Sequence, residues 1–529
     1  MTTDVLPAGQ VKAATERKAR KKFEFPTALT TVALVTIAVW LAALFIPAGA
    51  YEHSEDGAPI PGTYHRVQSP LGAGEKLQQL VLAPVNGMYG LRTDTGFVDT
   101  EAVGSMFGAV GVVLFILSIG AFISVTFATR SLEVAVGGLA ARLREKEKGG
   151  LLIAAIMVLF SLLGTTMGFS VETFGFYSLF IPLMAALGYD RMVTSVMIIV
   201  GALIGVTTST VNPFATGVAA GEAGVSIGDG IGLRILLWVL LTGIAVAYTL
   251  RYAARIRRDP SASVVGFELD RAEGVGPGAS PASATTAPQE RLTGTQKWVL
   301  VITAATFVLL IISVIPWSSI LGAVAGPADD LHHTTEAKPL WFELNWWFPQ
   351  LSMLFIIASV VVGLVARMKE REIVKLISQG AADMIGPSLV IVLAAGVSVI
   401  MTNTQTLDTI LNSVEQVVRG TSVAVFAVVN IVVNFPLSFI VPSTSGHAVL
   451  AMPLLAPLSD FAGVSRAVTI TAFQLGHGLM LMGSPTAVVV VGGLAVTKVG
   501  YDKYLRFVLP MLLIMFVVSS VVLGVAAMK

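Results

Sequence analysis

Four polar stretches interrupt long apolar segments of this sequence, at residues 164–173, 207–213, 442–447 and 483–486. Their hydroxyl and freed carbonyl oxygens suit a small hard cation such as Na⁺, and the N–H groups of a helix that restarts there favour a carboxylate. The candidate substrate-binding residues are Thr165, Thr166, Ser170, Glu172, Thr173, Asn212, Ser443, Thr444, Ser445, His447, Ser484 and Thr486. The candidate coupling-ion residues are Thr207, Thr208, Ser209, Thr210, Asn212, Gly483, Ser484 and His477. The alternative is that these small polar residues only allow close helix packing.

The same stretches carry signals for the start of a helix. Asn212 and Ser484 each precede a proline, and this pair is typical of a helix N-terminus. Ser443 in the third stretch, and Ser170 or Thr173 in the first, offer hydroxyl caps as well. We therefore expect several helix N-termini to converge on one cavity, where their positive dipole ends favour an anionic substrate.

Three ionisable residues fall within or beside the stretches: Glu172, His447 and His477. A carboxylate near the centre of a spanning helix costs ~2.5 to 3.5 kcal/mol on insertion scales, so Glu172 is a functional candidate. It can hold a substrate ammonium, bind a proton, or occupy the first turn of a helix where its charge suits the dipole. The histidines can carry a coupling proton near neutral pH or act as hydrogen-bonding packing residues. We expect no metal beyond Na⁺ and no cofactor.

The composition places the chain in a membrane. Of the 529 residues, 54% are hydrophobic and only 13% are charged, and the mean hydropathy is +0.80, whereas soluble domains carry about 25% charge. The net charge of +1 argues against a nucleic-acid partner. The basic first residues lack a cleavage signal and are interpreted as a cytoplasmic tail. The sequence thus predicts a multi-pass protein of the cell membrane with a cytoplasmic N-terminus.

An internal repeat links the two halves at an offset of 275 positions. Gly111 matches Gly386, Ser170 matches Ser445, and the match continues through later positions without a gap. Basic loops mark the cytoplasmic side. By this rule, one polar hairpin enters the membrane from the cytoplasmic side and its copy enters from the outside. We therefore predict an all-α polytopic membrane protein with two inverted-topology repeats, each with a re-entrant helical hairpin and a broken transmembrane helix.

The expected organisation follows from the loops and the repeat. It comprises a tail at 1–26, a scaffold span and external loop at 27–103, a first repeat at 104–252, a cytoplasmic linker at 253–295, scaffold spans at 296–370 and a second repeat at 371–529. The first repeat holds an inner hairpin at 149–188 and a broken helix at 191–220, and the second holds an outer hairpin at 422–460 and a broken helix at 465–495. Residues 131–143 and 407–418 are predicted to be interfacial helices, with ordinary loops as the alternative.

The polar stretches also resemble those of a known family. The segments concerned are 164–172, 188–190, 212–214, 441–448 and 452–458, and the similarity runs from the first span to residues 501–504. They look like YfcC/DcuC-type carriers of the ion transporter superfamily. That resemblance implies a homodimer in which a mobile transport domain moves against a scaffold domain as an elevator, and a substrate that is a C4-dicarboxylate or a basic amino acid.

One segment departs from the amino acid type of that family. Where that type tends to have Gly-Asp-Gly and a following Asn in the second broken helix, this sequence has Gly476-His477-Gly478 and Leu481. The departure removes an acid and an amide. It weighs against a basic substrate and against an intact second cation site.

The sequence therefore predicts an ion-coupled secondary transporter of a small organic carboxylate, either a C4-dicarboxylate or an amino acid, with Na⁺ or H⁺ as the coupling ion. The expected partners are this substrate, the lipid bilayer and a second copy of the chain. The alternative is a cation/proton antiporter or channel without an organic substrate, with Glu172 and the histidines as an ion relay. An enzyme is not predicted, because the spans hold no paired acids or metal cluster.

Overall fold

A computed structural model describes residues 28–52, 60, 62–89, 109–145, 149–272, 291–315, 317, 321, 340–344, 346–418 and 421–528. The predicted tail at 1–26 and much of the predicted external loops and linker lie outside the described residues. In the described part, nine helices are long and apolar enough to cross a membrane, and two shorter apolar helices accompany them. The structure is built almost wholly from helices, as predicted, with one short antiparallel pair formed by β1 (Gly49–Ala50) and β2 (His65–Arg66).

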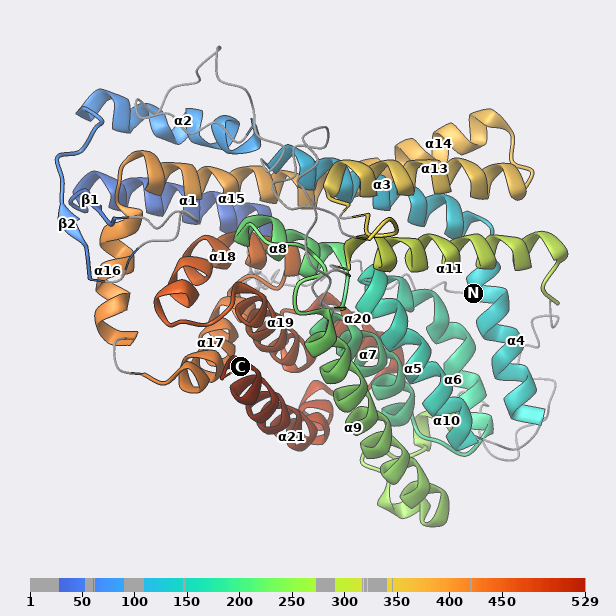
Figure 1. Ribbon diagram of the computed structural model, residues 1–529. Coiled ribbons are helices and arrows are strands. Elements are labelled where there is room, and N and C mark those ends of the chain that lie inside the picture. Colours follow the sequence, from blue (N-terminus) through green and yellow to red (C-terminus); the bar gives the residue numbers. More distant parts are fainter. Residues whose placement is uncertain are drawn as a thin grey trace, which may run out of the picture.

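The helices form two packed regions, seen in the upper and lower parts of Figure 1. The upper region contains α1 (Ala28–Phe45), α2 (Ala73–Tyr89), α3 (Ala109–Ala128), α11 (Gly294–Val314), α13 (Phe348–Val365), α14 (Glu370–Asp383) and α15 (Ile385–Asn403). Much of its core is a set of phenylalanines, among them Phe115, Phe122 and Phe355. Aromatic pairs of this kind add packing energy beyond the apolar area that they bury.

The lower region holds the first hairpin, the second broken helix, and one helix each of the second hairpin and the first broken helix around a second core. Its elements are α5 (Gly149–Met167), η1 (Val171–Phe176), α6 (Tyr177–Ala186), α7 (Arg191–Thr207), α9 (Ile231–Arg258), α17 (Val423–Ile440), α19 (Arg466–Gly483), α20 (Val488–Thr497) and α21 (Tyr501–Ala527). Between the two regions lie η2 (Pro213–Gly217), α8 (Val218–Ala223) and α18 (Thr444–Phe461), and α18 packs against both α8 and α15.

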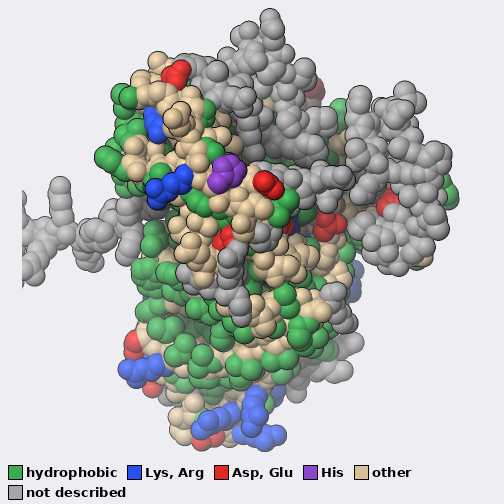
Figure 2. Space-filling view, turned by 60° about the vertical axis from the view of Figure 1, so that its left-hand side comes forward, with side chains coloured by type: hydrophobic (Ala, Val, Ile, Leu, Met, Phe, Trp, Pro, Cys, Tyr) green, Lys and Arg blue, Asp and Glu red, His purple; other side chains and the backbone are tan. Residues whose placement is uncertain are grey.

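The outer surface of the lower region is apolar. Figure 2 shows hydrophobic side chains gathered in a band across the described part of one face, with Lys and Arg side chains near its lower end. Val239 on α9 and Leu513 and Val517 on α21 are among the exposed members of this surface. A helix whose backbone bonds are internal and whose outer side chains are apolar is stable in lipid.

Element boundaries follow the repeat closely. Arg191 begins α7 and its match Arg466 begins α19, and α5 and α17 likewise correspond at the offset of 275. Both predicted hairpins and both predicted broken helices contain an irregular break between two helical parts. The predicted interfacial segments are helices, α4 (Ser131–Glu145) and α16 (Leu407–Val418). The opposite orientation of the two repeats stays a prediction.

Two helices lie where the sequence indicates loops. Residues 73–89 form α2, which packs against α15 and buries Gln79 so that it accepts a hydrogen bond from Asn403 over 3.2 Å. Residues 370–383 form α14, which packs against α3 so closely that a Cβ on Gly380 would overlap the backbone of Gly120. Both helices carry polar residues on one face, and a search for continuous apolar spans therefore misses them.

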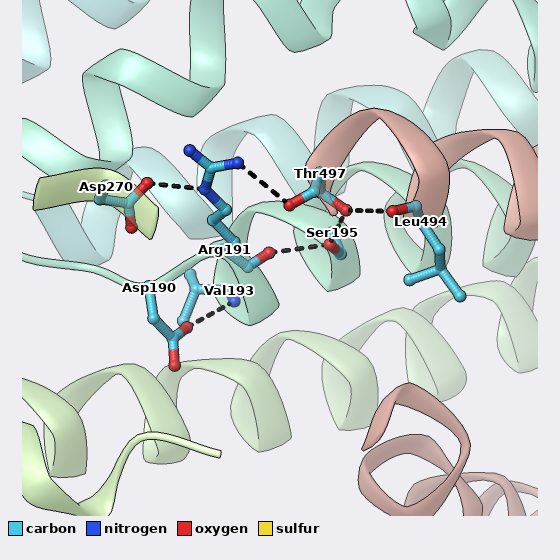
Figure 3. A network of polar contacts seen from close by, with 7 residues as sticks. All are labelled: Asp190, Arg191, Val193, Ser195, Asp270, Leu494 and Thr497. Atoms are coloured by element: carbon cyan, nitrogen blue, oxygen red, sulfur yellow. Dashed lines mark hydrogen bonds and ion pairs between the residues drawn. The ribbon is translucent and has the colours of Figure 1, made fainter. Parts of the chain in front are cut away.

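Part of the predicted linker is also folded. The helix α10 (Glu268–Ala272) places Asp270 against α7, where its carboxylate lies 2.7 Å from Arg191 Nε with both side chains almost fully buried (Figure 3). Asp190 caps α7 at Val193 and accepts hydrogen bonds from Tyr252 and Ser263. Burial raises the pKa of the Asp190 carboxyl, and these hydrogen bonds oppose the rise. Residues 259–272 of the predicted linker therefore contact the lower region through Ser263 and Asp270.

Candidate functional site

The first broken helix restarts at an asparagine cap, as predicted. After α7 ends at Thr207, the chain runs irregularly to Asn212, and η2 begins at Pro213. The Asn212 side-chain oxygen accepts from the N–H groups of Phe214 at 2.9 Å and Ala215 at 3.4 Å. This capping satisfies N–H groups that a helix start leaves unpaired.

The tip of the first hairpin is joined to this break through oxygen atoms. Thr165 Oγ1 donates to the Thr208 carbonyl at 2.9 Å and accepts from the Thr210 N–H at 3.0 Å. The Asn212 amide donates to the Gly164 carbonyl at 3.2 Å. Hydroxyl and carbonyl oxygens of two chain segments thus lie close together in a buried place, and hard cations take oxygen ligands of this kind.

The other hydroxyls of the break serve local structure. Thr207 and Thr208 donate back to carbonyls of their own helix at 2.7 and 2.8 Å, and Thr166 does the same in α5 at 2.7 Å. Ser209 and Thr216 share a 2.7 Å hydrogen bond. Bonds of this kind satisfy a helix end but leave oxygen lone pairs, so they fit both the packing interpretation and the ion-binding one.

Glu172 lies in the first turn of η1, and its carboxylate accepts from the Ser170 N–H at 3.0 Å. This is the contact expected of an acid that stabilises a helix start. The predicted hydroxyl cap is wrong here, because the Ser170 side chain makes no cap hydrogen bond, and the Thr173 hydroxyl donates to the Ser170 carbonyl at 2.5 Å instead. The carboxylate of Glu172 takes over the capping role.

The second hairpin begins its returning helix with the predicted serine cap. Ser443 Oγ accepts from the Gly446 N–H at 3.3 Å, and α18 starts at Thr444. Ser445 is buried in the same turn. Thr444 and His447, on the first turn of α18, both contact His477 on α19, so this hairpin is also joined to its broken helix.

An imidazole pair forms that junction. His447 Nδ1 and His477 Nδ1 lie 2.8 Å apart, and Ser438 Oγ on α17 lies 3.2 and 3.1 Å from these two atoms. His477 Nε2 lies 3.1 Å from the Thr444 hydroxyl. Each histidine is only 1% exposed, and the Phe473 ring packs against both. Glu172 and its repeat match His447 make their hydrogen bonds to different partners, Glu172 to the Ser170 N–H and His447 to Ser438 and His477.

The second broken helix restarts differently from the prediction. Ser484 does not cap α20, which begins at Val488 after Ala487 without a side-chain cap. The Ser484 hydroxyl instead accepts from the Thr486 N–H at 3.2 Å, and Thr486 Oγ1 donates to the Phe439 carbonyl at 3.1 Å. The prediction fails because a short turn at Ser484 uses the hydroxyl before the helix begins. The Gly483 carbonyl accepts from Tyr501 at 2.6 Å.

The two broken helices cross at the centre of the molecule. A Cβ on Gly478 of α19 would lie 2.5 Å from Thr207 Cα of α7. From α19 the Gln474 amide also donates to Thr216 at 2.7 Å, so a residue of the second broken helix contacts the break of the first. In the described residues, no group of three or more His, Cys, Asp or Glu could hold a metal ion.

Sequence reasoning missed Ser438, which contacts both histidines. A signal was available, because Asn430, Asn434 and Ser438 follow each other at intervals of four residues in an otherwise apolar helix. Residues at this spacing share one helix face. Buried polar residues inside a spanning helix face protein rather than lipid, and they mark candidate ligand or ion pathways.

Comparison with known proteins gives one family over almost the whole chain. Residues 25–528 match the model of the DcuC family, described as C4-dicarboxylate anaerobic carrier. An uncharacterized protein of Haemophilus influenzae is 30% identical over 473 residues, which cover 88% of this chain and 81% of that protein. A protein of Escherichia coli named "Putative basic amino acid antiporter YfcC" is 29% identical, with 97% of this chain and 98% of that protein covered.

Two solved transporter structures share the fold. The YdaH transporter of Alcanivorax borkumensis has a TM-score of 0.64 at 17% identity, with 94% of this chain and 98% of that chain covered. MtrF of Neisseria gonorrhoeae, described as one of a class of antimetabolite efflux pumps, has a TM-score of 0.62 at 14% identity, with 95% of each chain covered. The predicted fold class, a helical multi-pass membrane protein, is confirmed.

Proposed function

Since this chain belongs to the C4-dicarboxylate anaerobic carrier (DcuC) family, we propose that it is an ion-coupled secondary transporter of a small organic carboxylate. The substrate is a C4-dicarboxylate or an amino acid, and the coupling ion is Na⁺ or H⁺. The observation that carries the proposal is that each broken helix is joined to the tip of a hairpin. Irregular backbone inside a membrane is stable only where it faces protein or a water-filled site.

In this proposal the substrate carboxylate binds at the helix starts at Asn212 and Thr444. Helix N-termini carry partial positive charge and attract anions. The oxygens around Thr165 and Thr210 are the proposed cation ligands of the first break, because hard cations take oxygen ligands. The family name favours a dicarboxylate, and the name of the Escherichia coli relative favours an amino acid.

We propose an elevator movement as the way access alternates. The support is the separation of the fold into two regions with distinct hydrophobic cores, the lower of which holds the first hairpin, the second broken helix and one helix of each of the other two. The lower region then carries the substrate past the upper region, which acts as the scaffold in a homodimer. The protein lies in the cell membrane with its N-terminus in the cytoplasm.

Reconstitution into liposomes tests the proposal. Vesicles that contain the purified protein are tested for uptake of labelled succinate, fumarate, aspartate, arginine and lysine under an imposed Na⁺ or pH gradient, beside protein-free vesicles. Uptake of at least one compound, driven by one gradient, is the expected result. Folded protein that moves none of them under either gradient would contradict the proposed function.

A second candidate is a cation/proton antiporter or channel without an organic substrate. The buried pair of His447 and His477 favours it, because imidazoles titrate near neutral pH and can relay protons. Ion flux that is independent of every compound in the panel would support this candidate. Ion flux that requires one of the compounds would support the carboxylate transporter.

A further inference from the structure

We propose that His447 and His477 form a single proton-binding site, and that loading this site fixes Nε2 of His447 as a hydrogen-bond donor for a carboxylate of the substrate. The inference rests on the proposed transport function and names H⁺ as its coupling ion. The site consists of the two imidazoles together with Ser438 and Thr444.

The hydrogen bonds of the group allow only one proton between the two rings. Ser438 donates its hydroxyl proton to the Asn434 carbonyl at 2.5 Å, so its oxygen can only accept from the histidines. The two Nδ1 atoms lie 2.8 Å apart, and one of them must therefore carry the proton while the other accepts it. Either ring can be the donor, so the neutral pair has two arrangements.

Adding one proton leaves only one arrangement of N–H groups. The pair then has three N–H protons on four ring nitrogens, and one of the three occupies the contact between the Nδ1 atoms. The other two must lie on the two Nε2 atoms, whichever ring holds the formal charge. His477 Nε2 donates to the Thr444 hydroxyl at 3.1 Å. His447 Nε2, which is a donor in only one of the two neutral arrangements, is then a donor in every case, and this buried atom has no hydrogen-bond partner among the described residues.

A buried N–H of an imidazolium needs an acceptor, and an anion suits it best. Leaving a buried charge without a partner is strongly unfavourable, and a charged acceptor gives the stronger hydrogen bond. A carboxylate oxygen at His447 Nε2 supplies both the acceptor and the counter-charge. Because each ligand stabilises the bound state of the other, proton and carboxylate bind together, and this reciprocity is thermodynamic coupling.

Within the described residues, no fixed charge competes with a substrate carboxylate for the N–H group of His447 Nε2. Ser438, His447 and His477 lie on α17, α18 and α19. Besides the two histidines, these helices and the helices packed against them carry the following charged and titratable side chains: Arg191, Glu222, Asp408, Glu415, Asp460, Arg466, Tyr501, Asp502, Lys503, Tyr504 and Arg506. Arg191 pairs with Asp270, and Arg466 pairs with Asp460. The hydrogen-bond partners of the two imidazoles are each other, Ser438 and Thr444.

Other uses of the pair fit the geometry less well. Na⁺ takes oxygen ligands, whereas the atoms that face each other here are nitrogens. A purely structural histidine is expected to have its buried polar atoms satisfied, and His447 Nε2 is not. The short contact between the rings and the orphaned nitrogen together indicate a site that changes its protonation state.

The test uses proteoliposomes loaded with a pH-sensitive dye, with succinate and arginine as probes because both carry a carboxylate. Counterflow of labelled probe at equal pH measures binding and movement, and the dye measures proton movement that depends on the probe. The variants are His447→Asn, His477→Asn and the double variant. The matched control is His65→Gln, since His65 lies exposed on β2.

With wild type and the His65 variant we expect proton movement with one of the probes. In each of the two single histidine variants this proton movement should fall by about tenfold or more, within the usual range of coupling energies. The double variant should lose no more than the single ones, because one proton is shared. Proton movement that persists in either single variant, or wild-type counterflow without proton movement, would overturn the inference and leave carboxylate transport standing. Wild-type vesicles without counterflow of any panel compound would instead overturn the proposed function.

A measurement on the wild-type protein alone tests the inference even if the variants do not fold. Titration calorimetry of succinate and arginine in two buffers of different ionisation enthalpy counts the protons taken up on binding. Uptake of about one proton per bound carboxylate compound supports the shared site. Binding without proton uptake, or no binding of either compound, overturns it.

Discussion

The two hairpin and broken-helix units share a backbone plan and differ in the atoms that join their parts. In the first, Thr165, Thr210 and Asn212 connect the segments through oxygens and an amide. In the second, His447 and His477 connect them through ring nitrogens. Both units contain the breaks, whereas the side chains within the breaks differ. The first unit thus offers oxygen atoms at its junction, and the second offers ring nitrogens.

The two units also differ in the burial of an ion pair at the first residue of each broken helix. Arg191 and Arg466 are matched by the repeat, and each pairs with an aspartate. The Arg191 pair with Asp270 is almost fully buried, with 5% and 2% of the side chains exposed, whereas the Arg466 pair with Asp460 is 30% and 18% exposed. Burial should therefore decide how much each pair matters.

The largest effect is expected from Asp270→Ala. This change leaves the buried Arg191 guanidinium without its carboxylate, which costs ~3–5 kcal/mol, whereas Asp460→Ala should cost about 1 kcal/mol or less. The midpoint of thermal unfolding in detergent, followed by tryptophan fluorescence, measures both. Equal losses would show that α10 does not anchor α7.

A double variant separates charge from packing in that pair. Arg191→Met with Asp270→Leu removes both charges and keeps apolar volume, so it should recover most of the stability that Asp270→Ala loses. If the double variant were as unstable as the single one, the hydrogen bond from Arg191 to the Thr497 carbonyl, rather than the ion pair, would be the important contact.

An intermediate effect is expected at the matched glycines Gly201 and Gly476, where the hairpin helices cross the broken helices. A Cβ on Gly476 would overlap the Ile431 carbonyl oxygen, while a Cβ on Gly201 would lie 3.2 Å from Met157 Cα. Gly476→Ala should therefore destabilise the protein by ~1–3 kcal/mol through overpacking, and Gly201→Ala by less. The same unfolding measurement, with Gly243→Ala at an open helix surface as control, ranks them. The reverse ranking would mean that the second crossing adapts more easily than the first.

The sequence predicts the breaks well because their signals are local. Prolines, hydroxyl residues and the repeat identify where the helices stop, and Asn212 and Ser443 cap as expected. The contacts between segments are not local, which is why the meeting of His447 with His477 and Ser438 could not be derived from spacing. Likewise α2 and α14 depend on amphipathic packing against α15 and α3 rather than on continuous hydropathy.

The smallest effect is expected at the two residues that precede proline in the breaks. Asn212 receives two N–H groups of η2 and donates to Gly164, so Asn212→Ala should cost ~0.5–2 kcal/mol, the usual range for a lost cap. Ser484 caps no helix, and Ser484→Ala loses only contacts with Thr486, so its cost should lie at the lower end of a hydrogen bond's ~0.5–1.5 kcal/mol.

Transport of the panel compounds sharpens this last comparison beyond stability. Asn212 both orients a helix N-terminus and ties it to the first hairpin, so its loss should raise KM for the transported carboxylate and weaken any dependence on Na⁺ together. Ser484→Ala should leave both nearly unchanged. Conversely, if Ser484→Ala alone abolished the Na⁺ dependence, the cation would bind at the second break. The proposed cation site would then move from the first unit to the second.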